Sequence, residues 1–149
     1  MKPSIVLFGV LAFAINVHAQ KISAIDVPAA VKTQFTAMFP GIKADKWEME
    51  NGKYEAEFKQ NKIETSVLFE ADGKHVQTET EIAVSELPGG VKDYLSKNHA
   101  GKKIKEAAKI SAADGTLTYE AEIGGKDYIF DANGNFLRKE AEQNDNEER

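Results

Sequence analysis

Closely spaced carboxylates are the first groups in this sequence whose types and spacing could do chemistry. Glu55 and Glu57 stand two positions apart, and Glu120 and Glu122 repeat the arrangement in a second Tyr-Glu-Ala-Glu segment. Because side chains alternate between the two faces of a strand, each pair would project from one face. Such carboxylates could act as general acids and bases, bind cations or attract a basic partner.

Other groups that a catalytic centre needs are scarce. After residue 19 the chain has only two histidines, His75 and His99, and it has no cysteine. It lacks the Gly-x-Ser-x-Gly, His-Glu-x-x-His and phosphate-binding glycine motifs. We therefore expect no enzyme, no catalytic residue and no cofactor. A pocket holding either histidine beside a carboxylate would reverse this expectation.

A short acidic segment resembles part of a calcium-binding loop. Asp131, Asn133 and Asn135 alternate there, but a full loop needs further oxygen ligands, including a bidentate Glu at its twelfth position. Lys74 takes the place of Asn135 in the matching segment of the first half and would repel a cation. An Asn-Gly hairpin turn explains the residues fully, so we predict a turn and no metal site.

Three blocks of the sequence occur twice in the same order. Residues 27–32, 54–58 and 69–74 return as 87–92, 119–123 and 130–135. A duplicated unit with small changes in loop length explains this order. A single unit of about 60 residues would have a marginal core, so we expect the two copies to pack together.

Each copy is predicted to contain one helix followed by four strands. Pro28 and Pro88 suit the first turn of a helix, and the apolar period then changes from 3.6 to 2. The predicted strands are 44–50, 53–59, 62–70 and 74–82 in the first copy, and 104–111, 116–123, 126–131 and 135–141 in the second. Hairpin turns such as Asn51-Gly52 make them antiparallel. The expected fold is α+β: two tandem α-β-β-β-β repeats whose helices pack on one face of the sheet.

The N-terminus has the pattern of an export signal. Lys2 precedes an apolar run over 5–17, and Val17 and Ala19 suit a cleavage site after Ala19. The run is too short for a bilayer span, and no cysteine follows that could carry a lipid anchor. The predicted organisation is a signal peptide at 1–19, a first repeat at 20–83, a second repeat at 84–142 and a disordered acidic tail at 143–149.

The formal charge of −5 disfavours nucleic acid as a partner and favours a basic one. If Trp47 and Phe69 face the helices, the opposite face of the sheet is strongly acidic, and apolar residues interrupt it at equivalent places in the two copies. The candidate partner-binding residues on this outward face are Leu68, Ile129, Phe136, His75, Glu55, Glu57, Glu120 and Glu122. Apolar anchors with a charged rim are typical of protein interfaces, although an acidic face can also serve only solubility.

The duplicated Pro-led helix, the Tyr-Glu-Ala-Glu strands and the Phe-Asp/Glu-Ala-Asp/Asn-Gly turns carry a family resemblance over 27–141. With the export signal, they resemble the PepSY-like, beta-lactamase-inhibitor-like exported proteins of Gram-negative bacteria. The resemblance implies a periplasmic or secreted protein without catalytic activity. PepSY domains are linked to inhibition of peptidases, and the beta-lactamase inhibitor binds its enzyme with a concave sheet. No contact residue of that inhibitor can be matched to a position in this chain.

The favoured hypothesis is an exported, non-catalytic module that binds a protein or peptide through the open face of its sheet, as an inhibitor or regulator of an envelope enzyme. The alternative is an acidic cation-binding or envelope-stress protein. The sequence names neither the partner nor the oligomeric state, and it leaves open whether the two half-sheets are continuous.

Overall fold

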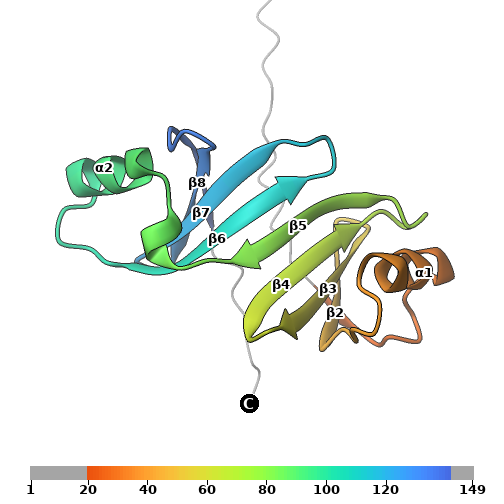
Figure 1. The fold of residues 1–149 in the computed structure, drawn as a ribbon. Coiled ribbons are helices and arrows are strands. Elements are labelled where there is room, and N and C mark those ends of the chain that lie inside the picture. The colour runs from red at the N-terminus through yellow and green to blue at the C-terminus, as the bar shows by residue number, and fades with distance from the viewer. Residues whose placement is uncertain (1–19, 142–149) are drawn as a thin grey trace, which may run out of the picture.

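The computed structural model describes residues 20–141, which form one nine-stranded antiparallel sheet with its strands in chain order. The strands are β1 (Gln20–Ile22), β2 (Lys46–Glu50), β3 (Lys53–Gln60), β4 (Ile63–Phe69), β5 (His75–Glu81), β6 (Ile104–Ala112), β7 (Leu117–Ile123), β8 (Lys126–Asp131) and β9 (Phe136–Ala141). Two helices, α1 (Ala29–Met38) and α2 (Gly89–Asn98), and a short 3-10 helix, η1 (Val84–Glu86), complete the fold (Figure 1). The predicted signal peptide and acidic tail lie outside the described residues.

The two half-sheets are continuous. β5 of the first repeat pairs with β6 of the second, with Thr78 opposite Ser111 and Thr80 opposite Lys109. All eight predicted strands are present, and β1 is a ninth that was not predicted. β1 has only three residues, which is too short for an alternation of apolar and polar side chains to be recognised in the sequence.

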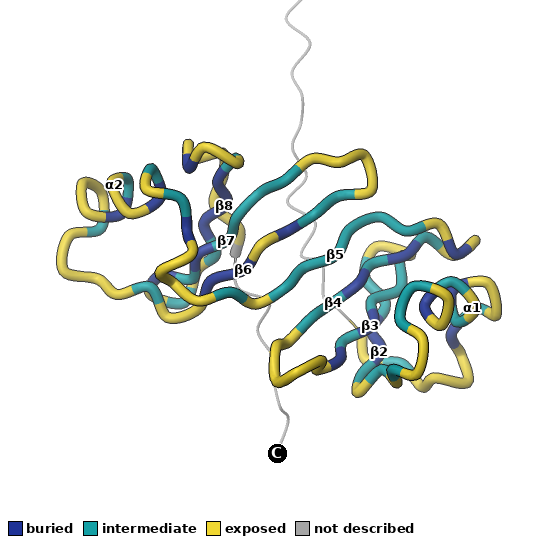
Figure 2. The backbone as a smooth tube through the Cα atoms, viewed as in Figure 1, coloured by how far each residue is buried: buried dark blue, intermediate teal, exposed yellow. Residues whose placement is uncertain are grey.

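Each helix buries apolar side chains against its own half of the sheet. In the first repeat the Phe35 ring lies 5.5 Å from the rings of both Trp47 and Phe58. In the second, Val91 and Leu95 join a cluster that includes Phe130. Burial of each such side chain contributes about 1.5–3 kcal/mol, which makes these clusters the main stabilising elements. Figure 2 shows the two buried regions, one at each helix, linked by the half-buried β5.

Cross-strand pairing places both cores on the same face of the sheet. Val67 of the first core is paired with Thr78, which is paired in turn with Ser111. Ser111 and Ala107 share a face of β6 because they are an even number of positions apart. Ala107 belongs to the second core, so both helices contact one face, which leaves the opposite face uncovered by any described helix.

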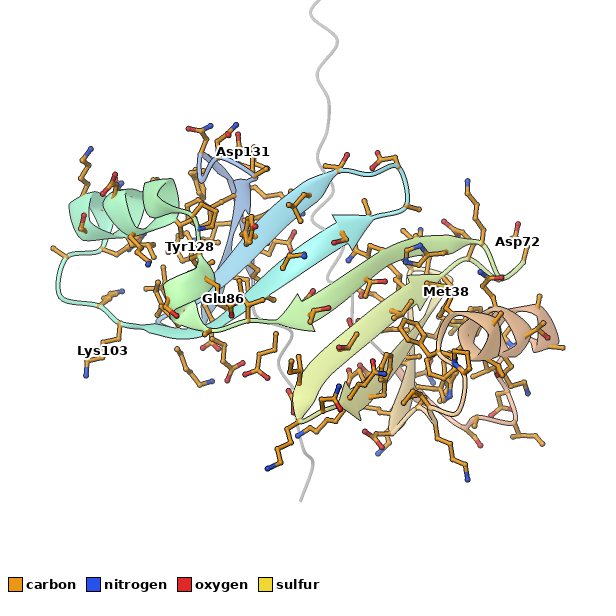
Figure 3. All side chains as sticks on the ribbon, viewed as in Figure 1. Met38, Asp72, Glu86, Lys103, Tyr128 and Asp131 are labelled. Carbon is orange, nitrogen blue, oxygen red and sulfur yellow. The ribbon has the colours of Figure 1, made fainter. Side chains whose placement is uncertain are left out.

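The repeated turns dock onto the helices. A Cβ at Gly73 would lie 2.7 Å from the Ala30 carbonyl oxygen, and a Cβ at Gly134 would lie 2.7 Å from the Val91 nitrogen. Both glycines also have positive φ, so the duplicated motif needs glycine for conformation and for space. The Asp131 carboxylate accepts hydrogen bonds from the backbone N–H groups of Asn133 and Asn135, each at 2.9 Å. The predicted hairpin turn at this segment is therefore confirmed (Figure 3).

Candidate binding face of the sheet

The sheet face opposite the helices, called here the open face, is built by alternate residues of strands β2 to β9. Cross-strand pairing places on it Lys46, Glu48, Glu50, Lys53, Glu55, Glu57, Ser66, Leu68, Gln77, Glu79, Glu81, Ala108, Ile110, Thr118, Glu120, Glu122, Asp127, Ile129, Arg138 and Glu140. Both repeats contribute, and carboxylates are the commonest groups.

The open face is concave. Ile129 is only 1% exposed and Ile110 only 8%, although neither belongs to a helix-side core. Glu79 on β5 interacts electrostatically with Asp127 on β8 and Glu140 on β9, three and four strands away. In a flat sheet those strands would be about 14 to 19 Å away. The sheet therefore curls, and Ile110 and Ile129 form an apolar floor.

Two carboxylates from different repeats are held in this concavity. Burial, and then the charge of Glu55, raises the pKa of Glu79 to about 7. Burial, and then the charge of Glu79, raises the pKa of Glu120 to about 8. Burial also raises the pKa of Glu55, although a hydrogen bond with Ser66 opposes the shift. Negative charge is therefore costly here, and a positive group brought into the concavity would be stabilised.

A lysine offsets the charge at the first-repeat end of the face. Carboxylate oxygens of Glu48, Glu55 and Glu57 lie within 4.8 Å of one another. Lys46 Nζ lies 2.9 Å from Glu48 Oε1 and 3.4 Å from Glu57 Oε1. Oxygen atoms at this spacing can hold a cation, which would have to compete with the Lys46 ammonium group.

Most of the predicted partner-binding residues share the open face. Leu68 is directly opposite Glu55 and Gln77, and Glu120 is directly opposite Ile129. Glu57 and Glu122 lie on the same face. Ile129, expected as an exposed anchor, is instead a buried part of the floor, because the curvature encloses it.

The outward placement predicted for Phe136 and His75 is wrong. Consecutive residues of β4 pair with Gln77 and His75 of β5, and consecutive residues of β8 pair with Arg138 and Phe136 of β9. Val76 and Leu137 are therefore extra residues, and each reverses the face of the residue before it. Phe136 stacks on Tyr94 of α2 at 4.8 Å, and His75 lies edge-on to Phe69 at 6.1 Å. Both rings are on the helix side.

Sequence reasoning omitted several residues from the candidate site that the structure brings there. Glu79 and Ile110 lie opposite each other, and the charges of Asp127 and Glu140 help to raise the pKa of Glu79. Strand alternation in β5 is sufficient to place Glu79 and Glu81 on the same face of the sheet. The proximity of Glu79 to β8 and β9 depends on curvature, for which the sequence gives no local signal.

Among the described residues, no helix combines the length and apolar character needed to cross a membrane. The architecture defines a class of proteins in which a curved antiparallel sheet carries helices on one side and leaves its acidic face open. The family described as "Putative beta-lactamase-inhibitor-like, PepSY-like" matches residues 13–74 and 52–138, and the chain belongs to this family. The two matches overlap over residues 52–74, and together they suggest an internal repeat. No curated protein matches the sequence.

Solved structures share the fold. One, described as "putative periplasmic proteins" from Bacteroides eggerthii, has 20% identity and a TM-score of 0.68 over 76% of this chain and 88% of the other. A DUF2874 family protein from Bacteroides uniformis has 20% identity and a TM-score of 0.67 over 76% and 88% of the two chains. A BLIP-like protein from Bacteroides fragilis has 20% identity and a TM-score of 0.61 over 82% and 92%. These similarities establish the fold.

Proposed function

We propose that this protein is an exported, non-catalytic module that binds a basic segment of another protein in the concavity of its open face. The observation that carries the proposal is the gathering of carboxylates from both repeats, Glu55, Glu79 and Glu120 among them, around a buried apolar floor. Binding of this kind would suit an inhibitor or regulator of an envelope enzyme.

The shape and charge of the face support a protein partner. Protein interfaces combine an apolar centre with a polar rim, and the half-buried Leu68 provides such a centre between acidic residues. A negative concavity in a chain of net charge −5 would accelerate association with a positively charged partner.

The surroundings of the histidines support a non-catalytic role. The His75 ring lies 3.0 Å from the Thr78 hydroxyl, and the His99 ring packs on Tyr128 at 4.8 Å. Both histidines are therefore on the helix side, across the sheet from the carboxylates. A histidine and a carboxylate that act together as general acid and base would have to lie on the same side of the sheet.

Export is supported by the apolar run at 5–17 and by the periplasmic description of the relative from Bacteroides eggerthii. We propose cleavage after Ala19, repeats at 20–83 and 84–142, and a tail at 143–149. N-terminal sequencing of the protein recovered from a periplasmic extract should begin at Gln20. Recovery of an intact Met1 would contradict export by cleavage.

Site-specific crosslinking tests the binding face. A photo-crosslinking amino acid at Leu68 should yield a discrete adduct in a periplasmic extract, whereas the same group at exposed Thr33 of α1 should not. Charge reversal by Glu57→Lys with Glu122→Lys should reduce the Leu68 adduct about tenfold, because it places positive charge against a basic partner.

The matched control is Asp93→Lys at an exposed position on α2, away from the open face. It should leave the Leu68 adduct unchanged. Adducts of equal yield at Leu68 and Thr33 would rule out the concavity as the binding site. Equal decreases in the Leu68 adduct after charge reversal on the open face and on α2 would rule it out as well.

The alternative, cation binding, is favoured by the spacing of Glu48, Glu55 and Glu57. Calorimetric titration with Ca²⁺ distinguishes the two functions. A dissociation constant below about 0.1 mM that is lost in Glu57→Gln would support a cation site. Weaker heats, unchanged in Glu57→Gln, would leave protein binding as the function of the face.

A further inference from the structure

A groove of about 550 Å³ lies in the second repeat, between the C-terminal half of α2 and the start of β6. Leu95, Ile104 and Val84 supply its apolar lining, and Lys92, Lys102 and Lys103 are its cationic residues. Small-molecule sites in proteins typically measure about 300–1,000 Å³. The groove is distinct from the open face because it adjoins α2, on the helix side of the sheet. Figure 3 labels one of its lining residues, Lys103, on the segment that joins α2 to β6.

The first repeat fills the corresponding space with apolar side chains. Phe39 packs on Phe58 at 4.7 Å, and Ile42 packs against the first core. The second repeat has His99 and Lys102 at these positions, and the two loops match in their backbone hydrogen bonds. The groove therefore exists because polar residues replace the apolar side chains that close its counterpart.

The charge around the groove is opposite to that of the molecule. None of its described lining residues is acidic, although the chain carries a net charge of −5. Lys92 Nζ donates a hydrogen bond to the Ser85 carbonyl at 3.2 Å, which holds this ammonium group at the helix. An apolar floor beside ammonium groups complements a ligand with an apolar body and a negatively charged head.

We infer that this groove binds an amphipathic carboxylate, such as a medium-chain fatty acid, with its alkyl chain along Leu95 and Ile104 and its carboxylate among the lysines. The inference concerns a second site and does not depend on the proposed partner-binding role of the open face.

Titration of the purified protein with decanoate, followed by NMR, tests the inference. Decanoate should shift the amide signals of Gly101 and Ile104 with a dissociation constant below about 1 mM. Decyltrimethylammonium, which has the same chain and a positive head, and acetate, which has the head alone, should each bind at least about tenfold more weakly.

Two variants locate the site. Lys103→Glu should weaken decanoate binding about tenfold, whereas Lys43→Glu, the same change at the equivalent loop position of the first repeat, should not alter it. The double variant His99→Phe with Lys102→Ile introduces the first-repeat residues at these positions. It should close the groove and abolish decanoate binding, while its circular dichroism spectrum remains that of the folded protein.

Three results would overturn the inference: no decanoate shifts, equal binding of decanoate and decyltrimethylammonium, or equal losses in Lys103→Glu and Lys43→Glu. A peptide of residues 142–149 that binds the groove more tightly than decanoate would also overturn it, because the chain's own acidic segment would then be the better occupant.

Discussion

Among the residues of the open face, Glu79 and Glu120 have the largest free-energy cost of ionisation in the folded protein. Their pKa values are raised by burial to about 7 and about 8, so the folded state holds these protons more tightly than the unfolded chain. Their contribution favours the folded state most at low pH. That contribution falls as pH rises from the unfolded value, about 4.5, through the folded values, and it is constant above them.

We therefore predict that Glu79→Gln and Glu120→Gln each raise the free energy of unfolding by about 1–3 kcal/mol at about pH 9, and change it little near pH 4. The measurement is urea denaturation across this pH range. Glu81→Gln, at an exposed position two residues from Glu79, is the control and should show no such pH dependence. Destabilisation by both substitutions at high pH would mean that the charged forms are stabilised in the concavity.

Lys46 has the opposite role, because it supplies positive charge to the nearby carboxylates. Lys46→Met leaves Glu48, which is only 7% exposed, without the ammonium group 2.9 Å away. We expect a loss of about 1–3 kcal/mol at pH 7, measured by urea denaturation. Lys59→Met, which removes an exposed ion pair with Glu64, should change stability much less, because solvent screens that pair. Equal losses in the two variants would show that Lys46 has no special role.

At the level of elements, the two helices begin differently. α1 begins with two alanines and α2 with Gly89 and Gly90. A Cβ on Gly89 would meet no atom within 4 Å, whereas a Cβ on Gly90 would lie 2.8 Å from the Asn133 carbonyl oxygen in the docked turn. The first glycine therefore only lowers helix propensity, and the second is required by the contact.

Gly89→Ala should accordingly stabilise the protein by about 0.5–1 kcal/mol, and Gly90→Ala should destabilise it by at least about 1 kcal/mol. Thermal and urea unfolding of the two single variants measure both effects. If both substitutions stabilise, the turn and helix can separate without cost, and the docking of β8–β9 on α2 is not structurally important.

The elements were predictable where local chemistry defines them. Each of these signals spans only a few residues: Pro28 for the helix start, Asn51-Gly52 for the turn, and the alternation of Tyr54 with Phe58 for the strand. The structure agrees with the sequence prediction at these places. Register shifts are different, because an extra residue such as Leu137 of β9 is defined only by the partner strand. The predicted face of Phe136 and His75 was wrong for that reason.

At the scale of the whole molecule, pairing of β5 with β6 makes one sheet from two cores. Neither repeat can lose its strands without exposing an edge of the other. We therefore predict that the repeats unfold together. Trp47 is the only tryptophan and lies in the first core, so its fluorescence reports on one repeat alone.

Ile123→Ala in the second core should lower stability by about 2–5 kcal/mol. It should move the Trp47 fluorescence transition in urea by the same amount as the circular dichroism transition. Ala56→Gly in the first core provides the reciprocal control and should also shift both transitions together. A circular dichroism change that leaves the Trp47 transition in place would show that the repeats are independent.

The sequence by itself determined the duplication, the helix and strand positions and the acidic character of one face, because these depend on periodicity, turn residues and alternation within short segments. Only the tertiary structure decided that the two half-sheets join and that the face is concave, so that the charges of Asp127 and Glu140 act on Glu79. Curvature and register arise from twist and packing summed over many strands, and no single segment of the chain encodes that sum.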